Sequence, residues 1–399
     1  MNVLFLTMVS ITTLKKRGIY EDLLNYFIGQ NHNVYIVAPV ERRHKIKTSF
    51  FKDGQAHILN VRTLNLSQTN VIEKGLGQVL IERQYLSAIK AHIKNVSFDL
   101  VLYSTPPITM TKVIDYIKKR DNAYAYLLLK DIFPQNAVDM KMIRKGGVLH
   151  KIFKKKEKIL YEMSDTIGCM SEANKRFILK YNPQIPEQKV EVNPNSIKPL
   201  HIDYDKKDIV KVRNKYNLPL NKTIFVYGGN LGVPQGVDFL IETISTLKNP
   251  LAHILIVGNG TQFKKLESWF KSNKPINATL LSCLPRKEYG ALLAACDVGM
   301  IFLDKNFTIP NFPSRLLSYL EMKKPVLAAT DVNTDIGNVI EKARCGYWVE
   351  SGDINSMQEK ISKLCANNLN ALGERSWMLL QNEYLVEKSY NLIIEKLNV

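Results

Sequence analysis

Two segments in the second half of the chain carry residue types that suit an anion such as a diphosphate. In the first, Gly228, Gly229 and Asn230 directly follow an apolar run that ends at Tyr227. Glycines let a backbone approach a ligand closely and can leave amides free to face an anion. A plain tight turn would use the same glycines, and that alternative stays open. Because the spacing is not G-x-G-x-x-G, the segment does not predict a dinucleotide-binding protein.

The second segment begins with Ser314 and Arg315, which open a helical pattern that ends before Pro325. The unpaired amides and the dipole of a helix N-terminus favour negative charge, and a neighbouring guanidinium adds charge-assisted hydrogen bonds. The pair therefore predicts a diphosphate-binding element. The alternative is that Ser314 only caps the helix and that Arg315 is solvated.

Polar residues also end apolar runs in the first half of the chain. These are Lys130 with Asp131, Ser104, and Asn195 in an Asn-Pro-Asn sequence. Ligands of open parallel α/β sheets bind outside the carboxyl ends of the strands, so these positions are candidate site residues. A charged pair at the end of an apolar strand is costly unless it is wet, paired or used. The alternatives are a structural Lys–Asp ion pair and turns stiffened by proline.

A separate stretch between residues 141 and 180 is rich in lysine and amphipathic. On a helix, Leu149, Ile152, Phe153, Ile159, Leu160 and Met163 would form one apolar stripe. This pattern is typical of a helix on an anionic membrane surface, with a core-packing helix as the alternative. Nucleic acid is not favoured, because aromatic interleaving and module signatures are absent. The predicted membrane contacts are Lys151, Ile152, Phe153, Lys154, Lys155 and Lys158.

The composition fits a peripheral protein with an anionic partner. The 55 Lys and Arg against 37 Asp and Glu give a formal net charge of +18. The first residues lack the basic region and cleavage site of a secretory signal, and no window approaches the roughly 20 apolar residues that span a bilayer. The scattered cysteines include no C-x-x-C pair, so no metal site is predicted. We expect a cytoplasmic protein.

The order of the segments predicts an α/β fold with two parallel-sheet domains. A strand–helix–strand pattern over residues 3–38 recurs over 223–257. Continuous apolar runs alternate with helical patterns, as sheets covered on both faces require. The polar stretch 198–211 indicates a linker, which places the domains at 1–200 and 201–376.

Together these motifs resemble the GT-B glycosyltransferases of family 4, particularly the bacterial capsule and O-antigen branch that includes the L-fucosamine transferases. The likeness runs across nearly the whole chain. Its most specific elements are Lys130–Asn136, Val226–Gly232 with Gln235–Gly236, Pro313–Val326 and Val192–Ile197. The resemblance implies two Rossmann-like domains facing a central cleft. It also implies that a final helix, within residues 377–399, packs back on the first domain.

Two departures from the family pattern stand out. The wider family carries two glutamates eight residues apart in the second domain, where this chain has Pro310 and Ser318. The Arg and Lys that commonly follow the glycine segment correspond to Val233 and Gln235. Neutralisation of a diphosphate would then depend on other donors. The candidates are Arg315, Arg17 and helix amides.

By resemblance, the protein moves a sugar, expected to be N-acetylated and amino-substituted, from a UDP-sugar to a polyprenyl diphosphate-linked glycan. The reaction would belong to capsule or O-antigen polysaccharide biosynthesis at the inner face of the cell membrane. The enzyme would be retaining and metal-independent, with the UDP-sugar as co-substrate and no cofactor, and leaving-group stabilisation would supply much of the catalysis.

The resemblance also assigns roles to residues. In the second domain, the donor would contact Gly228, Gly229, Asn230, Ser314 and Arg315, with its base near Cys283, Leu284 and Pro285. In the first domain, Asp131 would be catalytic by orienting a hydroxyl or the acceptor, and Gly18 would let the first loop approach the phosphate. The acceptor side would be lined by Arg17, Lys130, Ser104 and Asn195.

Two other classes of function remain open at this stage. A UDP-sugar epimerase on the same fold would need no acceptor, and it would have no use for a basic amphipathic stretch. A non-catalytic sugar- or lipid-binding protein would be consistent with the missing pair of glutamates.

Overall fold

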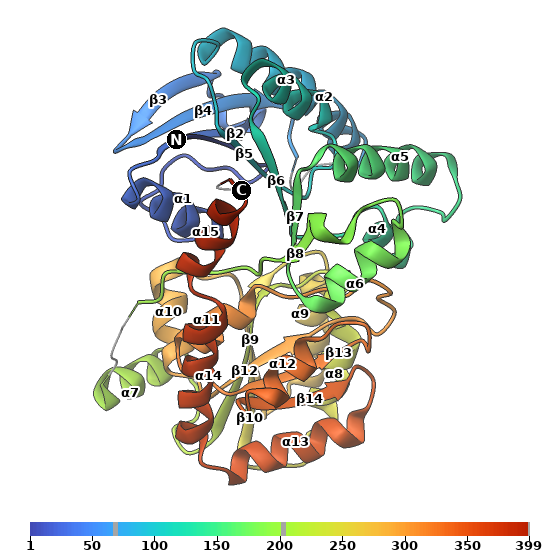
Figure 1. The fold of residues 1–399 in the computed structure, drawn as a ribbon. Coiled ribbons are helices and arrows are strands. Elements are labelled where there is room, and N and C mark those ends of the chain that lie inside the picture. The colour runs from blue at the N-terminus through green and yellow to red at the C-terminus, as the bar shows by residue number, and fades with distance from the viewer. Residues whose placement is uncertain (67–70, 201–204, 398–399) are drawn as a thin grey trace. The chain divides into compact units, whose positions relative to one another are not determined.

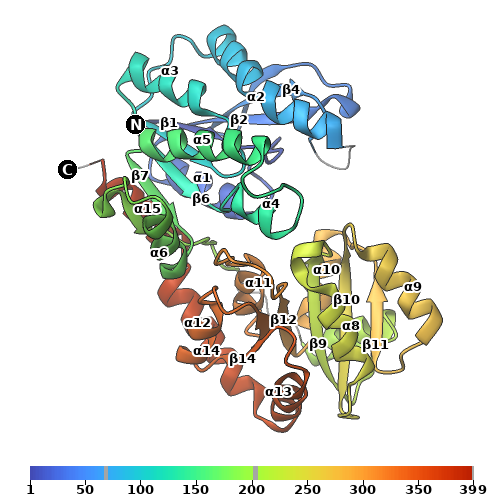
Figure 2. The ribbon, with the colours of Figure 1, turned by 90° about the vertical axis from the view of Figure 1, so that its right-hand side faces the viewer.

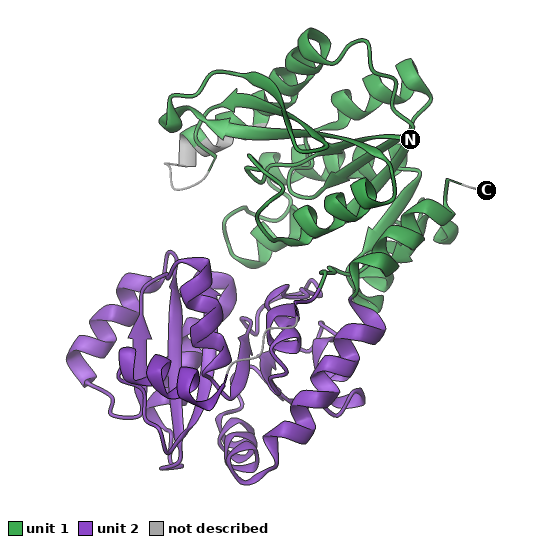
Figure 3. Cartoon of the chain, turned by 90° about the vertical axis from the view of Figure 1, so that its left-hand side faces the viewer, with its two compact units in different colours: residues 1–198, 385–399 green, residues 199–384 purple. Residues whose placement is uncertain are grey.

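The computed structural model describes residues 1–66, 71–200 and 205–397, which form two compact units (Figure 3). Unit 1 comprises Met1–Lys198 with Leu385–Val399, and unit 2 comprises Pro199–Tyr384. Each unit is a largely or wholly parallel sheet covered by helices, which confirms the predicted fold class. Part of the predicted linker, residues 201–204, lies outside the described residues.

Unit 1 is built on an eight-stranded sheet in the order β3-β4-β2-β1-β5-β6-β7-β8 (Figure 1). Its strands are β1 Asn2–Leu6, β2 Asn33–Glu41, β3 Ser49–Asp53, β4 Ala56–Thr63, β5 Leu100–Ser104, β6 Tyr124–Leu129, β7 Thr166–Cys169 and β8 Val190–Val192. Neighbours pair in parallel except β3, an antiparallel edge strand that the sequence pattern did not indicate. The carboxyl ends of β5 to β8 therefore meet at one edge, where the predicted polar residues follow.

Helices cover both faces of this sheet, which explains why its central strands are continuously apolar. On one face α2 (Val71–His92), α3 (Thr111–Asp121) and α5 (Val148–Met163) lie side by side, and on the other α1 (Ile19–Gly29) packs on α15 (Val386–Glu395) (Figures 1 and 2). The remaining helices are α4 Gln135–Asp139, α6 Glu172–Tyr181, η1 Arg42–His44 and η2 Glu187–Lys189.

The C-terminal region contains two helices where the sequence suggested one. α14 (Leu369–Glu383) belongs to unit 2, and α15 belongs to unit 1. A buried hydrogen-bond chain attaches α15 to the sheet: Ser389 Oγ donates to Asn193 Oδ1 (2.6 Å), and Asn193 Nδ2 donates to Tyr126 Oη (2.9 Å). Because Tyr126 lies in β6, this attachment also supports the strand that ends at Lys130.

Unit 2 is a six-stranded parallel sheet in the order β11-β10-β9-β12-β13-β14. Its strands are β9 Thr223–Asn230, β10 Ala252–Asn259, β11 Ala278–Leu281, β12 Val298–Phe302, β13 Val326–Thr330 and β14 Gly346–Glu350. α13 packs on α8 and α14 packs on α11. The helices are α7 Lys206–Lys215, α8 Val237–Ser245, α9 Phe263–Asn273, α10 Arg286–Ala294, α11 Arg315–Glu321, α12 Ile336–Lys342 and α13 Ile354–Ala366, with η3 at Val233–Gln235.

The glycine segment lies at the end of the sheet and not in a loop. β9 continues through Gly228 and Gly229 to Asn230, paired in parallel with the end of β10. A Cβ atom on Gly258 of β10 would lie 1.9 Å from the Gly229 carbonyl oxygen, so glycine keeps the two strands paired to the edge. The Gly228 N–H donates to Tyr319 Oη (3.3 Å). The expectation that this amide is free to face an anion is therefore wrong.

Candidate functional site

Arg315 is the central side chain of the candidate site in unit 2. It is the first residue of α11, and its guanidinium carbon lies 4.3 Å from the centroid of the Tyr227 ring. Its Nη1 atom is buried and has no hydrogen-bond partner in the part of the chain that the structure describes. A buried donor without an acceptor is costly, and an anionic ligand would supply the missing acceptor. Arg315 as a whole is half-buried, so the alternative of a solvated Arg315 stays open for the rest of the guanidinium.

Gly229 leaves space beside this guanidinium. It is exposed and has a φ of 122°, a backbone conformation that favours glycine. A Cβ atom at this position would lie 3.8 Å from Arg315 Nη2. The turn that follows is ordered by Gln235, whose Oε1 accepts from Asn230 Nδ2 (3.2 Å) and from the Gly232 N–H (3.0 Å). Gln235 thus shapes the turn where the resembling family has a basic residue.

Ser314 does not cap α11. Its side chain is exposed and makes no capping hydrogen bond, so the capping alternative is wrong. Because α11 is only 7 residues long, its dipole adds little to the charge of Arg315. Glu321 accepts a hydrogen bond from the Leu200 N–H (2.8 Å), which gives it a structural contact at the start of unit 2.

The predicted base-binding segment, Cys283–Pro285, connects β11 to α10 at the same sheet edge. Cys283 and Pro285 are exposed and Leu284 is half-buried. Their predicted contact with a nucleotide base stays a prediction. Within residues 1–66, 71–200 and 205–397, no group of three or more His, Cys, Asp or Glu side chains is placed to hold a metal ion.

Asp331 is a site residue that the sequence analysis missed. It directly follows β13 and is buried, which raises its pKa to about 6. Its Oδ1 accepts from the N–H groups of Asn333 (2.8 Å) and Thr334 (3.1 Å), and Thr334 Oγ1 donates to the Asn311 carbonyl (2.7 Å). Asp331 thereby ties the loop after β13 to the segment before Arg315. An acidic residue directly after an apolar strand was the available signal.

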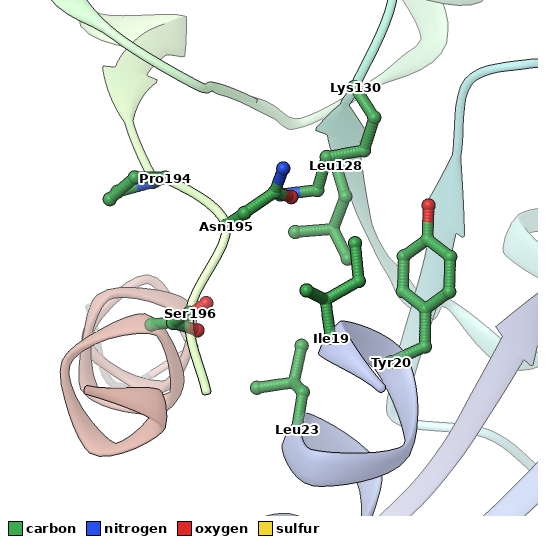
Figure 4. A pocket seen from close by; sticks show the side chains of 9 residues that line it. Ile19, Tyr20, Leu23, Leu128, Lys130, Pro194, Asn195 and Ser196 are labelled. Atoms are coloured by element: carbon green, nitrogen blue, oxygen red, sulfur yellow. The ribbon is translucent and has the colours of Figure 1, made fainter. Parts of the chain in front are cut away.

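A small pocket in unit 1 brings together two predicted residues, Lys130 and Asn195, whose side chains point toward one another (Figure 4). Asn195 is 7% exposed; its Nδ2 donates to Met170 Sδ (3.4 Å), and its Oδ1 has no partner among the described residues. Burial lowers the pKa of Lys130 to about 7. The other lining residues are Ile19, Tyr20, Leu23, Leu128, Pro194, Ser196 and Ser389.

Asp131 follows Lys130, but the structure shows no ion pair between these two described residues. Asp131 Oδ2 instead accepts a short hydrogen bond from Asn136 Nδ2, and burial raises the pKa of Asp131 to about 6. Thr105 Oγ1 donates to the Asp131 carbonyl (3.0 Å) and accepts from the Lys130 N–H (3.1 Å). The alternative of a structural Lys–Asp pair is therefore wrong, and the backbone of both residues is held rigidly.

The other predicted residues of unit 1 are engaged within the unit. Arg17 donates to the Lys198 carbonyl, and Ser104 is buried. A Cβ atom on Gly18 would meet the carboxylate of Glu21, so a side chain already lies against this glycine. The roles of Arg17, Gly18 and Ser104 toward a ligand stay predictions.

α5 divides the predicted apolar stripe between two faces. Leu160 is fully buried, and the Phe153 ring packs edge-on against Phe133 with centroids 5.0 Å apart. Ile152 and Ile159 are 48% and 38% exposed. The expected single stripe on one face is therefore wrong, because Leu160 and Phe153 pack inside unit 1 while Ile152 and Ile159 are exposed. What remains is an exposed apolar ridge on α5, formed by Val148, Leu149, Ile152 and Ile159.

The four predicted lysines of α5 also differ from one another. Lys154 lies 2.6 Å from Glu157, a carboxylate that is 1% exposed, so its charge is used inside the unit. Lys158 lies 3.7 Å from Glu162 at the surface. Lys151 and Lys155 are exposed beside the ridge. No helix in the described part of the chain has the length and apolarity to cross a membrane.

Residues 208–376 match the family model "Glycosyl transferases group 1". This stretch contains Gly229, Arg315 and Asp331. The match covers most of unit 2. The whole chain is similar to "Probable glycosyltransferase WbjE" of Pseudomonas aeruginosa, with 22% identity over 323 residues, which cover 80% of this chain and 78% of the relative.

Two solved structures share the fold of this chain at 14% identity. WaaG, a glycosyltransferase involved in lipopolysaccharide biosynthesis, superposes with a TM-score of 0.68 over 98% of this chain and 99% of its own. HepE of Anabaena in complex with UDP-glucose superposes with a TM-score of 0.71 over 100% of this chain and 99% of its own. At this identity the likeness establishes the GT-B fold.

Replacing Arg315 with alanine is expected to weaken binding of UDP about 30-fold. The variant removes a charge-assisted contact worth on the order of 2 kcal/mol, while a partly exposed cation contributes little to folding. Isothermal titration calorimetry with UDP measures the change. The matched control is Arg344→Ala, an exposed arginine before β14 at the opposite end of the same sheet. Equal UDP affinity in Arg315→Ala and wild type would contradict the site.

Replacing Asp131 with asparagine is expected to stabilise the protein at pH 7 by about 1 to 2 kcal/mol. The folded pKa of about 6 lies above the ordinary 3.8, so ionisation of Asp131 opposes folding. The gain should be full above about pH 6, shrink as the pH falls, and disappear below 3.8, where the wild-type carboxyl is protonated in both states. Urea unfolding across this pH range tests it. A variant less stable than wild type at pH 7 would show that the carboxylate is structurally required.

Proposed function

We propose that the protein is a glycosyltransferase that moves a sugar from a UDP-sugar to a polyprenyl diphosphate-linked glycan. The observation that carries the proposal is the family match over residues 208–376, in the same unit that presents the unpartnered Arg315 beside Gly229. The fold neighbours support it, because HepE binds UDP-glucose and WaaG is described as acting in lipopolysaccharide biosynthesis. An N-acetylated amino sugar and a capsule or O-antigen acceptor follow from the sequence resemblance.

Arg315 would act on the leaving group. Departure of UDP leaves negative charge on the β-phosphate, and a guanidinium held in place by stacking on the Tyr227 ring stabilises that charge without reorganising. This role does not need the two glutamates that the chain lacks. We assign retention of anomeric configuration and independence of metal and cofactor on the family resemblance.

Asp131 would act on the acceptor side. A carboxyl group with a pKa near 6 is largely ionised at neutral pH and can accept a proton or a hydrogen bond from a sugar hydroxyl. Hydrogen bonds from Asn136 and from the Ile132 N–H fix the orientation of this carboxylate. We therefore retain Asp131 as the catalytic residue of the proposal, and Lys130 with Asn195 as residues that contact the acceptor.

The direct test incubates purified protein with radiolabelled UDP-sugars, with and without a polyprenyl diphosphate-linked glycan. Labelled lipid formed only when the acceptor is present supports transfer, and Asp131→Asn should lower the rate while UDP binding persists. Isomerised sugar nucleotide formed without acceptor would indicate an epimerase. Nucleotide binding without either product would indicate a non-catalytic binding protein.

The exposed apolar ridge on α5, flanked by lysines, supports a place for the enzyme at the inner face of the cell membrane, where a polyprenyl-linked acceptor resides. Apolar side chains can enter the headgroup boundary while each nearby lysine contributes about 1 kcal/mol of attraction to anionic lipid. Lys154 is excluded from this count because it neutralises buried Glu157.

The double variant Lys151→Glu, Lys155→Glu is expected to lose binding to vesicles rich in phosphatidylglycerol by about 30-fold or more. Reversal converts two attractive charges into repulsive ones, and high salt should imitate the loss. Sedimentation with vesicles measures it. Lys206→Glu, Lys207→Glu on α7 changes the net charge equally and should bind as wild type does. Wild-type protein that stays in the supernatant at low salt would contradict membrane docking.

A further inference from the structure

Tyr289 lies against the glycine end of β9 from its position on α10. An ideal Cβ atom on Gly228 would fall 1.9 Å from Tyr289 Oη, so the phenol oxygen occupies the place where any other residue would begin its side chain. The Tyr289 side chain is half-buried, and the structure gives its hydroxyl no hydrogen-bond partner among the described residues. Gly228 is thus required to admit this tyrosine.

A second donor without an acceptor lies at the same end of β9. Arg315 Nη1 is buried and unpartnered, and Arg315 Nη2 is 3.8 Å from the position of a Cβ on the neighbouring Gly229. Burial raises the pKa of Tyr289 to about 12, and the charge of Arg315 opposes this rise, which places the two groups within electrostatic reach. The phenol therefore remains a protonated donor at neutral pH.

An anion at this edge needs donors that the backbone does not supply. The Gly228 amide is occupied by Tyr319, and Val233 and Gln235 stand where the resembling family has basic residues. Tyr289 and Arg315 come from two different helices, and each presents a donor lacking an acceptor to adjacent residues of one strand. A phosphate oxygen accepts several such bonds at once.

We propose that the Tyr289 hydroxyl donates a hydrogen bond to a non-bridging oxygen of the donor's diphosphate, beside Arg315. This inference rests on the proposed function and adds a specificity residue to it. Tyr289 replaces part of the phosphate recognition that basic side chains after the glycine segment would otherwise provide. If Tyr289 only filled the space above Gly228, removing its hydroxyl would leave the preference for UDP over uridine unchanged.

The test compares UDP with uridine in the full chain carrying Tyr289→Phe, which removes the hydroxyl and keeps the ring. We expect UDP to bind about tenfold more weakly, with uridine affinity and the thermal unfolding midpoint unchanged. Isothermal titration for UDP and competition at millimolar uridine give the two affinities. The matched control is Tyr347→Phe on β14. It removes a hydroxyl that accepts from Asn367 Nδ2 (3.1 Å), and it should bind both ligands normally.

If wild type binds UDP and Tyr289→Phe binds it equally well, this inference is overturned and the proposed function is not. Equal weakening of UDP and uridine would also overturn it, because the lost contact would not be to phosphate. Failure of the wild-type protein to bind any nucleoside diphosphate would overturn the proposed function together with this inference, so the two failures are distinguishable.

Discussion

The stacking of the Arg315 guanidinium on the Tyr227 ring is the interaction on which the candidate site of unit 2 depends. Stacking on Tyr227 offsets part of the cost of removing its charge from water, but a buried nitrogen remains without an acceptor. Other features of the edge depend on this arrangement. Gly229 leaves space beside the cation, and Asp331 binds the loop after β13 to the segment that precedes Arg315. The proposed contact with an anionic ligand rests on this nitrogen.

Unit 1 also contains buried charged groups, one basic and one acidic. Lys130 and Asp131 are consecutive at the end of β6, yet each is desolvated separately and neither neutralises the other. Their pKa values move toward neutrality, to about 7 and about 6, where proton exchange with a substrate is easiest. A structural ion pair would have stabilised the fold more. The proposed acceptor-side roles of Lys130 and Asp131 rest on this separate desolvation.

The two faces of α5 differ in what they contact, and the proposed docking depends on the exposed one. Glu157 and Leu160 face the sheet, and Lys154 neutralises the buried carboxylate. The opposite face keeps Ile152 exposed beside lysines that have no acidic partner in the described residues. A lipid-linked acceptor would reach the sheet edge of unit 1 from such a surface, since the α5 segment follows the loop that begins at Lys130.

The sequence by itself determined the two α/β sheets, because a strand buried on both faces must be continuously apolar, as β1 and β9 are. It also placed Lys130 and Asp131 at the sheet edge, since they directly follow an apolar strand, and Arg315 at the start of a helix. Only the tertiary structure decided that β3 pairs antiparallel, that Tyr289 covers Gly228, and that Lys154 forms an ion pair with Glu157. Periodicity reports local burial along the chain. The partner that a side chain meets across the sheet or between helices depends on residues far away in sequence, which no local pattern encodes.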